Sequence, residues 1–478
     1  MAILFDSTNR LFTLQTDHNM YQMKADRYGV LLHTWFGMKG SAFDYSYRIA
    51  YADRGFSGNP YDAGDDRTYS LDALPQEFPA YGSGDYRSSA LKVRYPDGTS
   101  ACDLRYLKHE IKAGKYSLPG LPALYDDSHN SDTLIITLED TRRMFYVHLY
   151  YGVMEDLDII TRAVCVENHS NEDIYLENIQ SVCIDYLYGD FDLHTFYGRH
   201  VKERNCQRTP VRHGIQSVGS TRGTSSHQYN PFLILSNHDT TEDNGSCYGF
   251  SFLYSGDFIG SAELDQYDQT RFLLGIHPDN FCYCVKPQER FYSPEAAMAY
   301  SDHGLGKLSR IFHRAYRNHL CRGKWTTTRR PVLLNDWEGV YFDFDGDKLI
   351  QMAKDASELG IELFVMDDGW FGKRDLDVSG LGDWVVNEKK LGCTLKEISD
   401  QIHALGLQFG IWFEPEGINE DSDLYREHPE WAMQIPGKLP TRSRQQLLLD
   451  FSREDVRDYI FTHICQVLDS ARIEYLKW

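Results

Sequence analysis

The stretch IELFVMDDGWFG, residues 361–372, is a short apolar run that ends in two adjacent carboxylates, Asp367 and Asp368. A mostly apolar run that stops at a polar break is typical of a strand buried on both faces of a parallel sheet. Polar side chains at the carboxyl end of such a strand mark the active face of many α/β enzymes. A single Asp-Asp pair also has a simpler explanation, in which one aspartate caps the next segment and the other contacts solvent.

The pattern recurs further along the chain, which favours the functional explanation. Apolar segments run into acidic or aromatic residues in RPVLLNDWEG (330–339), LQFGIWFEPEG (407–417) and IEYLKW (473–478). Amphipathic segments with helix start and stop signals lie between them: GDKLIQMAKDASELG (346–360), TLKEISDQIHALG (394–406) and SREDVRDYIFTHICQVLDSA (452–471). The alternation predicts four parallel βα units without the last helix, the first half of a (β/α)8 barrel of the TIM type over residues 329–478.

Residues 1–305 lack the helical period. Short alternating apolar runs such as TLIITLEDT (133–141) and MFYVHLYYGV (144–153) are bounded by Gly, Asn, Asp or Pro. This pattern predicts a large antiparallel β-sandwich. The helical pattern GKLSRIFHRAYRNHL follows, and we expect a helical connector over residues 306–328 between the sandwich and the half-barrel.

The bulk composition limits the classes of partner. The 478 residues include 49 Lys and Arg against 70 Asp and Glu, a formal charge of -21, which repels nucleic acid and anionic membrane surfaces. The N-terminus lacks the pattern of a signal peptide, and no apolar run approaches the roughly 18 residues of a membrane span. Ten cysteines without framework or zinc spacing are expected to be reduced, as in a cytoplasmic protein.

The predicted strand ends combine acids with aromatic and basic residues. Carboxylates accept hydrogen bonds from sugar hydroxyls, and an indole face covers the apolar side of a sugar ring. The indoles beside the acids are those of Trp337, Trp370, Trp412 and Trp478. Arg444 and Lys477 add positive charge to the same face, and a nearby cation keeps a carboxylate ionised. The sequence therefore predicts a sugar pocket, in which strand-end aspartates contribute little to core packing.

Two alternatives for the polar clusters stay open. Asp367, Asp368, Glu414 and Glu416 could instead hold a divalent metal, although no histidine joins them, and we expect no metal and no cofactor. The polar loop STRGTSSHQYNPF, residues 220–232, could contact a sugar or could satisfy its own hydrogen bonds around a buried turn. For this loop the structural explanation is favoured, because adjacent Ser and His residues do not by themselves form a catalytic triad.

Several long motifs resemble a known family. MDDGWFG, GLGDWVVNEKKL, GIWFEPE, LLLDFSREDVRDYI and YLKW are similar to the catalytic barrel of family 36 glycoside hydrolases, the bacterial α-galactosidases. LPQEFPAYGSGDYR (74–87) and STRGTSSHQYNPF resemble the sandwich domain of the same family, so the resemblance covers essentially the whole chain. It implies a retaining exo-hydrolase that releases terminal α-galactose from melibiose- and raffinose-type galactosides.

The resemblance also implies the substrate-binding residues. Asp367 and Asp368 would hold the galactose 4- and 6-hydroxyls. The same subsite would be lined by Trp337, Trp412, Arg444 and Lys477, and Asp53 would reach a neighbouring subunit's pocket in a homo-tetramer. The chain departs from the family at Asp336, where an asparagine is usual, and at Ser443 and Gln445, where glycine and asparagine are usual.

In the family the nucleophilic aspartate directly follows the Lys-Trp pair, which is Lys477-Trp478 here, and the acid/base aspartate lies further on. The resemblance therefore implies that no catalytic residue lies within this sequence and that the chain is an inactive fragment. The alternative is a complete, non-catalytic galactoside-binding protein. The fragment is favoured, because a half-barrel leaves apolar strand edges and faces uncovered.

Overall fold

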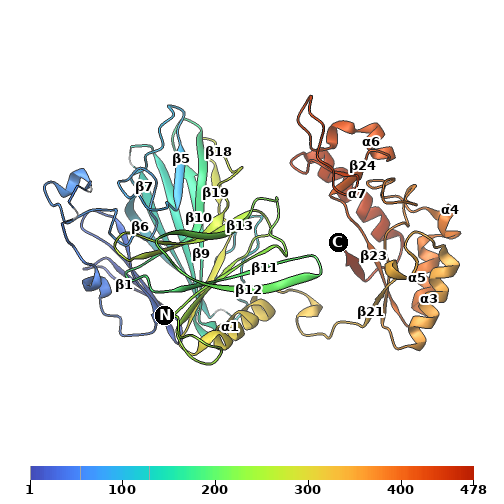
Figure 1. Ribbon diagram of the computed structural model, residues 1–478, viewed down its shortest axis with the longest axis horizontal. Helices are drawn as coiled ribbons and strands as arrows, with labels where there is room; N and C mark the ends of the chain where they lie inside the picture. Colours follow the sequence, from blue (N-terminus) through green and yellow to red (C-terminus); the bar gives the residue numbers. More distant parts are fainter. Residues whose placement is uncertain (1, 54, 57, 129, 141) are drawn as a thin grey trace. The chain divides into compact units, whose positions relative to one another are not determined.

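The computed structural model describes residues 2–53, 55–56, 58–128, 130–140 and 142–478 (Figure 1). The chain forms two compact units, Met1–Thr326 and Thr327–Trp478. The predicted connector, residues 306–328, contains helix α1 (Gly304–His319) and a 3-10 turn (Lys324–Thr326), and both belong to the first unit.

The first unit consists mostly of antiparallel sheet, as predicted. The first sheet has the order β1 (Ile3–Asp6), β2 (Leu11–Gln15), β3 (Asn19–Ala25) and β4 (Leu31–Met38). The largest sheet has the order β12 (Lys202–Pro210), β11 (Asp192–Arg199), β14 (Tyr229–Ser236), β15 (Cys247–Phe252), β20 (Ala296–Ser301), β9 (Ile159–Asn168), β8 (Phe145–Met154), β7 (Ser131–Asp140) and β6 (Arg105–Ala113), and β19 (Arg290–Tyr292) also pairs with β9. The third has the order β13 (Gly214–Ser220), β16 (Phe258–Leu264), β17 (Thr270–Ile276), β10 (Ile174–Tyr186) and β18 (Tyr283–Val285), with β5 (Leu91–Arg94) beside β10.

The interior of this sandwich contains compensated charges as well as apolar side chains. Glu77 is fully buried and accepts hydrogen bonds from the hydroxyls of Tyr21 and Tyr151, both at 2.7 Å. The Arg162 guanidinium, also buried, lies 3.0 Å from the same carboxylate. Burial alone would raise the pKa of Glu77, but Arg162 and the hydrogen bonds hold it below its ordinary value. Such a network supports the sandwich only while every member stays paired.

Helix α1 packs on this sandwich because one of its faces is apolar. Leu308, Ile311 and Phe312 are buried in one cluster with Ile234 of β14 and Ala297 of β20. The segment expected to connect the two domains therefore contributes to the core of the first unit.

The second unit contains the predicted parallel sheet. Its order is β21 (Leu333–Asn335), β22 (Leu363–Met366), β23 (Gln408–Trp412) and β26 (Tyr475–Lys477), and each neighbouring pair is parallel. The helices of this unit are α2 (Trp337–Val340), α3 (Gly346–Glu358), α4 (Glu388–Leu391), α5 (Leu395–Ala404), α6 (Asp423–Glu427) and α7 (Glu454–Ser470). A small antiparallel pair, β24 (Gly417–Asn419) and β25 (Gln446–Leu448), follows β23 in the chain.

The starts of α3 and α5 are capped by side chains, whereas within the described residues the cap expected at the start of segment 452–471 is absent, because α7 follows Arg453 without a side-chain cap. Thr394 and Glu397 form the predicted capping box at α5, in which each side chain bonds the backbone N–H of the other residue. Asp345 caps α3 by accepting from the Lys348 N–H. The starts of α3 and α5 are therefore fixed by local capping as well as by the apolar faces of these helices.

The ten cysteines carry free thiols, as predicted. Burial raises the pKa of Cys165 and Cys247 to about 12, so these thiols are poor nucleophiles. Within the described ranges no helix combines the length and apolar character needed to cross a bilayer.

Candidate functional site

The carboxyl ends of β21, β22, β23 and β26 meet at one edge of the parallel sheet, where a pocket of about 290 Å³ opens. Parallel strands bring their carboxyl ends together, which explains why residues far apart in sequence share this pocket. It is lined by Trp337, Asp367, Asp368, Trp412, Phe413, Glu414, Glu416, Arg444, Lys477 and Trp478. The residues predicted to bind the substrate in the second unit, Trp337, Asp367, Asp368, Trp412, Arg444 and Lys477, therefore all lie at this pocket.

Asp367 is the most heavily bonded acceptor of the pocket. Its Oδ2 receives hydrogen bonds from Asn335 Nδ2 and Lys477 Nζ, both at 2.5 Å, and its Oδ1 receives the Asp368 N–H at 2.9 Å. The Asp367 side chain is buried, whereas that of Lys477 is 43% exposed. The lysine thus reaches from the pocket rim onto the buried carboxylate of Asp367. Its contact with a sugar stays a prediction.

Asp368 is bound by an arginine that was not predicted from the sequence as a site residue. Arg374 is fully buried and binds Asp368 with two parallel hydrogen bonds, Nε to Oδ1 at 2.9 Å and Nη2 to Oδ2 at 2.8 Å. Its Nη1 donates to the carbonyls of Asp377 and Ser379 and to Asn419 Oδ1. Burial raises the pKa of Asp368, and the guanidinium opposes this rise.

Asp336 lies behind the pocket, at the end of β21. Its Oδ1 accepts the Asp367 N–H at 2.8 Å, which fixes the end of β22. The side chain is 1% exposed, and its Oδ2 has no hydrogen-bond partner among the described residues. Burial, with the neighbouring Asp367 charge, raises the pKa of Asp336 to about 7.

Two glutamates complete the acidic lining. Glu414 Oε2 is buried without a hydrogen-bond partner in the described part of the chain, and burial raises the pKa of Glu414. Glu416 is exposed and accepts from the Trp478 indole N–H at 2.7 Å. Within the described residues, no cluster of three or more His, Cys, Asp or Glu side chains has the arrangement of a metal site.

The prediction for Trp370 is wrong. Its ring is fully buried among Phe371, Trp384 and Phe413, and its indole N–H donates to the Trp412 carbonyl at 3.0 Å. The reason is the preceding Gly369, whose φ of +108° turns the chain so that the indole enters the core. Trp370 therefore supports the pocket from below and does not line it.

Trp337 and Trp412 line the pocket as half-buried side chains. Trp337 packs edge-on against Phe342, with ring centroids 5.0 Å apart, and Trp412 lies over Phe371. Both indoles are thus fixed from one side and leave the other side toward the pocket.

Arg444 is exposed, and its nearest carboxylate is that of Asp377, at 3.8 Å. Arg444 and Gln445 both have a left-handed backbone, with φ of 52° and 59°. Asparagine tolerates this conformation better than glutamine, so the departure at Gln445 leaves strain in the segment that carries Arg444.

Asp53 belongs to the first unit, whereas the pocket residues described above belong to the second. Its Oδ1 accepts the Gly55 N–H at 2.8 Å and lies 3.2 Å from Arg67 Nη2, and the side chain is exposed. A role at a neighbouring subunit's pocket stays a prediction.

The polar loop after β13 satisfies its own hydrogen bonds. The Ser225 N–H donates to the Ser255 carbonyl at 2.8 Å, and Ser226 Oγ donates to Gln228 Oε1 at 2.5 Å. These contacts agree with the internal hydrogen bonding expected from the sequence, but the expected burial is wrong, because residues 221–230 are exposed or half-buried.

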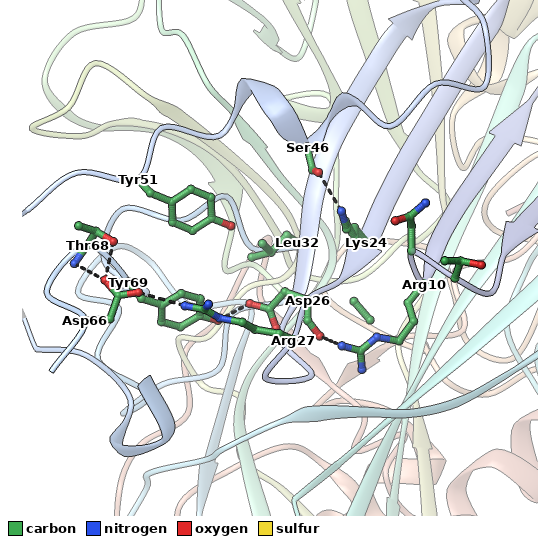
Figure 2. A pocket seen from close by; sticks show the side chains of 13 residues that line it. Arg10, Lys24, Asp26, Arg27, Leu32, Ser46, Tyr51, Asp66, Thr68 and Tyr69 are labelled. Carbon is green, nitrogen blue, oxygen red and sulfur yellow. Dashed lines mark hydrogen bonds and ion pairs between the residues drawn. The ribbon is translucent and has the colours of Figure 1, made fainter. Parts of the chain in front are cut away.

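A larger hollow of about 470 Å³ lies in the first unit against the β1–β4 sheet (Figure 2). Its polar groups are bound largely to one another. Lys24 donates to Ser46 at 3.0 Å, Arg27 pairs with Asp66 at 3.0 Å, and the Tyr69 hydroxyl donates to Asp26 at 2.5 Å (Figure 2). These bonds hold the surrounding loops to the sheet. At the strand-end pocket, in contrast, the buried oxygens Glu414 Oε2 and Asp336 Oδ2 have no hydrogen-bond partner among the described residues. The strand-end pocket is therefore the better candidate site.

Comparisons with known proteins cover both units. A family model described as the glycosyl hydrolase family 36 N-terminal domain matches residues 29–286, and one described as melibiase matches residues 290–478. The bifunctional alpha-galactosidase/sucrose kinase AgaSK of Mediterraneibacter gnavus is 53% identical over 479 residues, with 100% of this chain and 51% of that protein covered.

Solved structures agree over almost the whole chain. The alpha-galactosidase AgaB from Geobacillus stearothermophilus has a TM-score of 0.97 at 44% identity, covering 100% of this chain and 65% of that one. A variant of AgaA from the same organism, in complex with raffinose, has a TM-score of 0.96 at 43% identity, covering 98% of this chain and 65% of that one. The chain thus spans 51% to 65% of the length of these relatives.

Proposed function

Because this chain belongs to glycosyl hydrolase family 36, we propose that it supplies the galactose-binding part of a retaining α-galactosidase acting on melibiose- and raffinose-type sugars. The observation that carries the proposal is the pair Asp367 and Asp368 at the end of β22, buried yet facing a pocket. Solved relatives carry raffinose or stachyose, which end in galactose, and this supports the substrate class.

In the proposed complex, sugar hydroxyls donate to the two aspartates. Asp367 is already oriented by Asn335 and Lys477, and Asp368 by Arg374, so neither carboxylate has to be ordered when the sugar arrives. Carboxylate oxygens have further lone pairs and can accept from hydroxyls beside these partners. The Trp412 indole offers a face for the apolar side of the ring.

The proposal includes inactivity of the 478-residue chain. A retaining hydrolase needs a nucleophile and an acid/base about 5–5.5 Å apart, and the family resemblance assigns both to positions after Trp478. We expect the purified chain to release no aryl alcohol from an aryl α-galactoside while it still binds galactose. Galactose binding by the same sample is the control for a folded pocket. Turnover above an empty-vector preparation would contradict this prediction and would place the catalytic carboxylates within this chain.

Lys477→Met is expected to weaken galactose binding at least tenfold, about 1.4 kcal/mol. Methionine keeps the apolar stem but removes the ammonium that lies 2.5 Å from Asp367 Oδ2. Titration calorimetry with galactose measures the change. Lys396→Met on α5, which breaks an exposed pair with Asp400, is the matched control. Unchanged affinity of Lys477→Met would leave Lys477 as a rim lysine that only reaches solvent.

We also propose that the full-length protein is a cytoplasmic homo-tetramer. Ten free cysteines support a reducing compartment. Exposed aromatic side chains are frequent between residues 43 and 61 of the first unit and support a covered surface, since exposed apolar groups in number mark interfaces. They are Phe43, Tyr47, Phe56 and Tyr61. Light scattering coupled to gel filtration of the full-length protein tests the assembly, and a monomer at micromolar concentration would contradict it.

A further inference from the structure

Asp336 occupies the position where β21 passes into α2, and its side chain turns away from its own helix. As the residue before α2 it could cap that helix, yet its side chain makes no capping hydrogen bond. Its Oδ1 instead accepts the N–H of Asp367 on the neighbouring strand, at 2.8 Å. The contact therefore fixes the end of β22, which Asp367, the main acceptor of the pocket, directly follows.

The other carboxyl oxygen of Asp336 faces no donor. Oδ2 is buried without a partner among the described residues, and the whole side chain is 1% exposed. A buried carboxylate needs a cation or several donors, whereas a neutral carboxyl group leaves at most one weaker hydroxyl unpaired. The surroundings thus fit the protonated form of this side chain.

The charges around Asp336 do not supply the missing cation. Asp367 on β22 is negative, and the Lys477 ammonium of β26 is already bound to Asp367 at 2.5 Å. Asp368 is bound to Arg374, and Glu338 of α2 is exposed and accepts from the Tyr341 hydroxyl at 3.0 Å. A negative charge on Asp336 would compete with Asp367 for Lys477.

We propose that Asp336 is a positioning residue of the sugar pocket which works as a neutral acid, and that its ionisation weakens galactose binding by loosening the Asp367–Lys477 pair. The inference rests on the galactose-binding function proposed above. The pKa of about 7 places the change within the physiological range. A sugar that fills the pocket would exclude water from it and would favour the neutral form further, so binding takes up a proton.

The first experiment measures galactose affinity of the chain from pH 5.5 to 8.5 by calorimetry. The wild-type affinity is expected to change little below about pH 6.5 and to fall about fivefold between pH 7 and pH 8, because the neutral fraction of a group with a pKa of about 7 falls by that factor. Asp336→Asn keeps an oxygen for the Asp367 N–H and cannot ionise. Its affinity is expected to be independent of pH in this range and to match the wild type at low pH.

Asp336→Ala separates positioning from charge. It removes the acceptor of the Asp367 N–H, so we expect weaker binding at every pH, with asparagine restoring it. Asp355→Asn, at an exposed site on α3, is the matched control and should follow the wild-type profile. Wild-type affinity of Asp336→Ala, or parallel pH profiles of wild type and Asp336→Asn, would overturn the inference.

A second readout does not depend on sugar. The pKa of Asp336 is about 7 in the folded chain, against the ordinary aspartate value of 3.8, so between pH 3.8 and about pH 7 the folded chain holds a proton that the unfolded chain releases. The free energy of unfolding therefore falls as the pH rises through this window and is constant above it. The thermal midpoint of Asp336→Asn relative to wild type should therefore rise from pH 5 to pH 7. Absence of galactose binding in both proteins would refute the proposed function, whereas normal binding with identical pH profiles would refute this inference alone.

Discussion

Arg374→Leu is expected to lower the free energy of unfolding of the second unit by about 3–5 kcal/mol, because it leaves the buried Asp368 carboxylate without its guanidinium. Arg374 is fully buried, and its hydrogen bonds to Asp368, Asp377, Ser379 and Asn419 all lie within this unit. Without it, the pKa of Asp368 rises further, so the loss is smallest at acidic pH and grows as the pH increases.

Urea denaturation followed by tryptophan fluorescence measures this change. Most of the chain's indoles report on the second unit: Trp337, Trp370, Trp384, Trp412, Trp431 and Trp478. Arg426→Leu on α6 breaks exposed pairs with Asp421 and Asp423 and should cost about 1 kcal/mol or less. Combining Arg374→Leu with Asp368→Leu should recover much of the loss. A single variant as stable as the wild type would show that the pair is not needed for folding.

Asp367→Ala is expected to cost about 2–4 kcal/mol of galactose binding, since charged hydrogen bonds to a buried ligand are lost. The variant also leaves the donors of Asn335 and Lys477 without their acceptor, so the unit should lose stability as well.

Affinity and stability have to be measured on the same samples to separate these effects. Asp400→Ala removes an exposed carboxylate from α5 and serves as the control for a lost negative charge. If Asp367→Ala binds galactose like the wild type at a temperature where both are folded, Asp367 does not contact the sugar.

The sequence predicted the scaffold because local signals and tertiary structure agree there. Apolar runs stopped by acids became parallel strands, and the Thr394–Glu397 box became a helix start. The pocket residues could be predicted because parallel strands end at one edge, so residues after each strand converge without knowledge of any contact.

The supporting residues could not be predicted in the same way. Arg374 lies in an irregular segment with no period, and its burial depends on a partner six residues earlier that turns inward. Asn335 reaches Asp367 only because of the strand register, which pairs Asn335 with Val365. Because the sequence does not give this register, we predicted that strand-end aspartates contribute little to stability. In the structure the Asp367 side chain accepts three hydrogen bonds.

The single guanidinium of Arg374 has a consequence for the motions of the second unit. It joins the carbonyls of Asp377 and Ser379 to Asn419 of β24, so the long irregular segment after β22 is tied to regular structure at its centre. Hydrogen-bonded amides of this segment should exchange with solvent only when the second unit unfolds over a large part, including the sheet. Their exchange should therefore be slower than is usual for a region without helix or strand. The segment that follows Asp368 therefore behaves as part of one cooperative folding unit and not as a flexible lid.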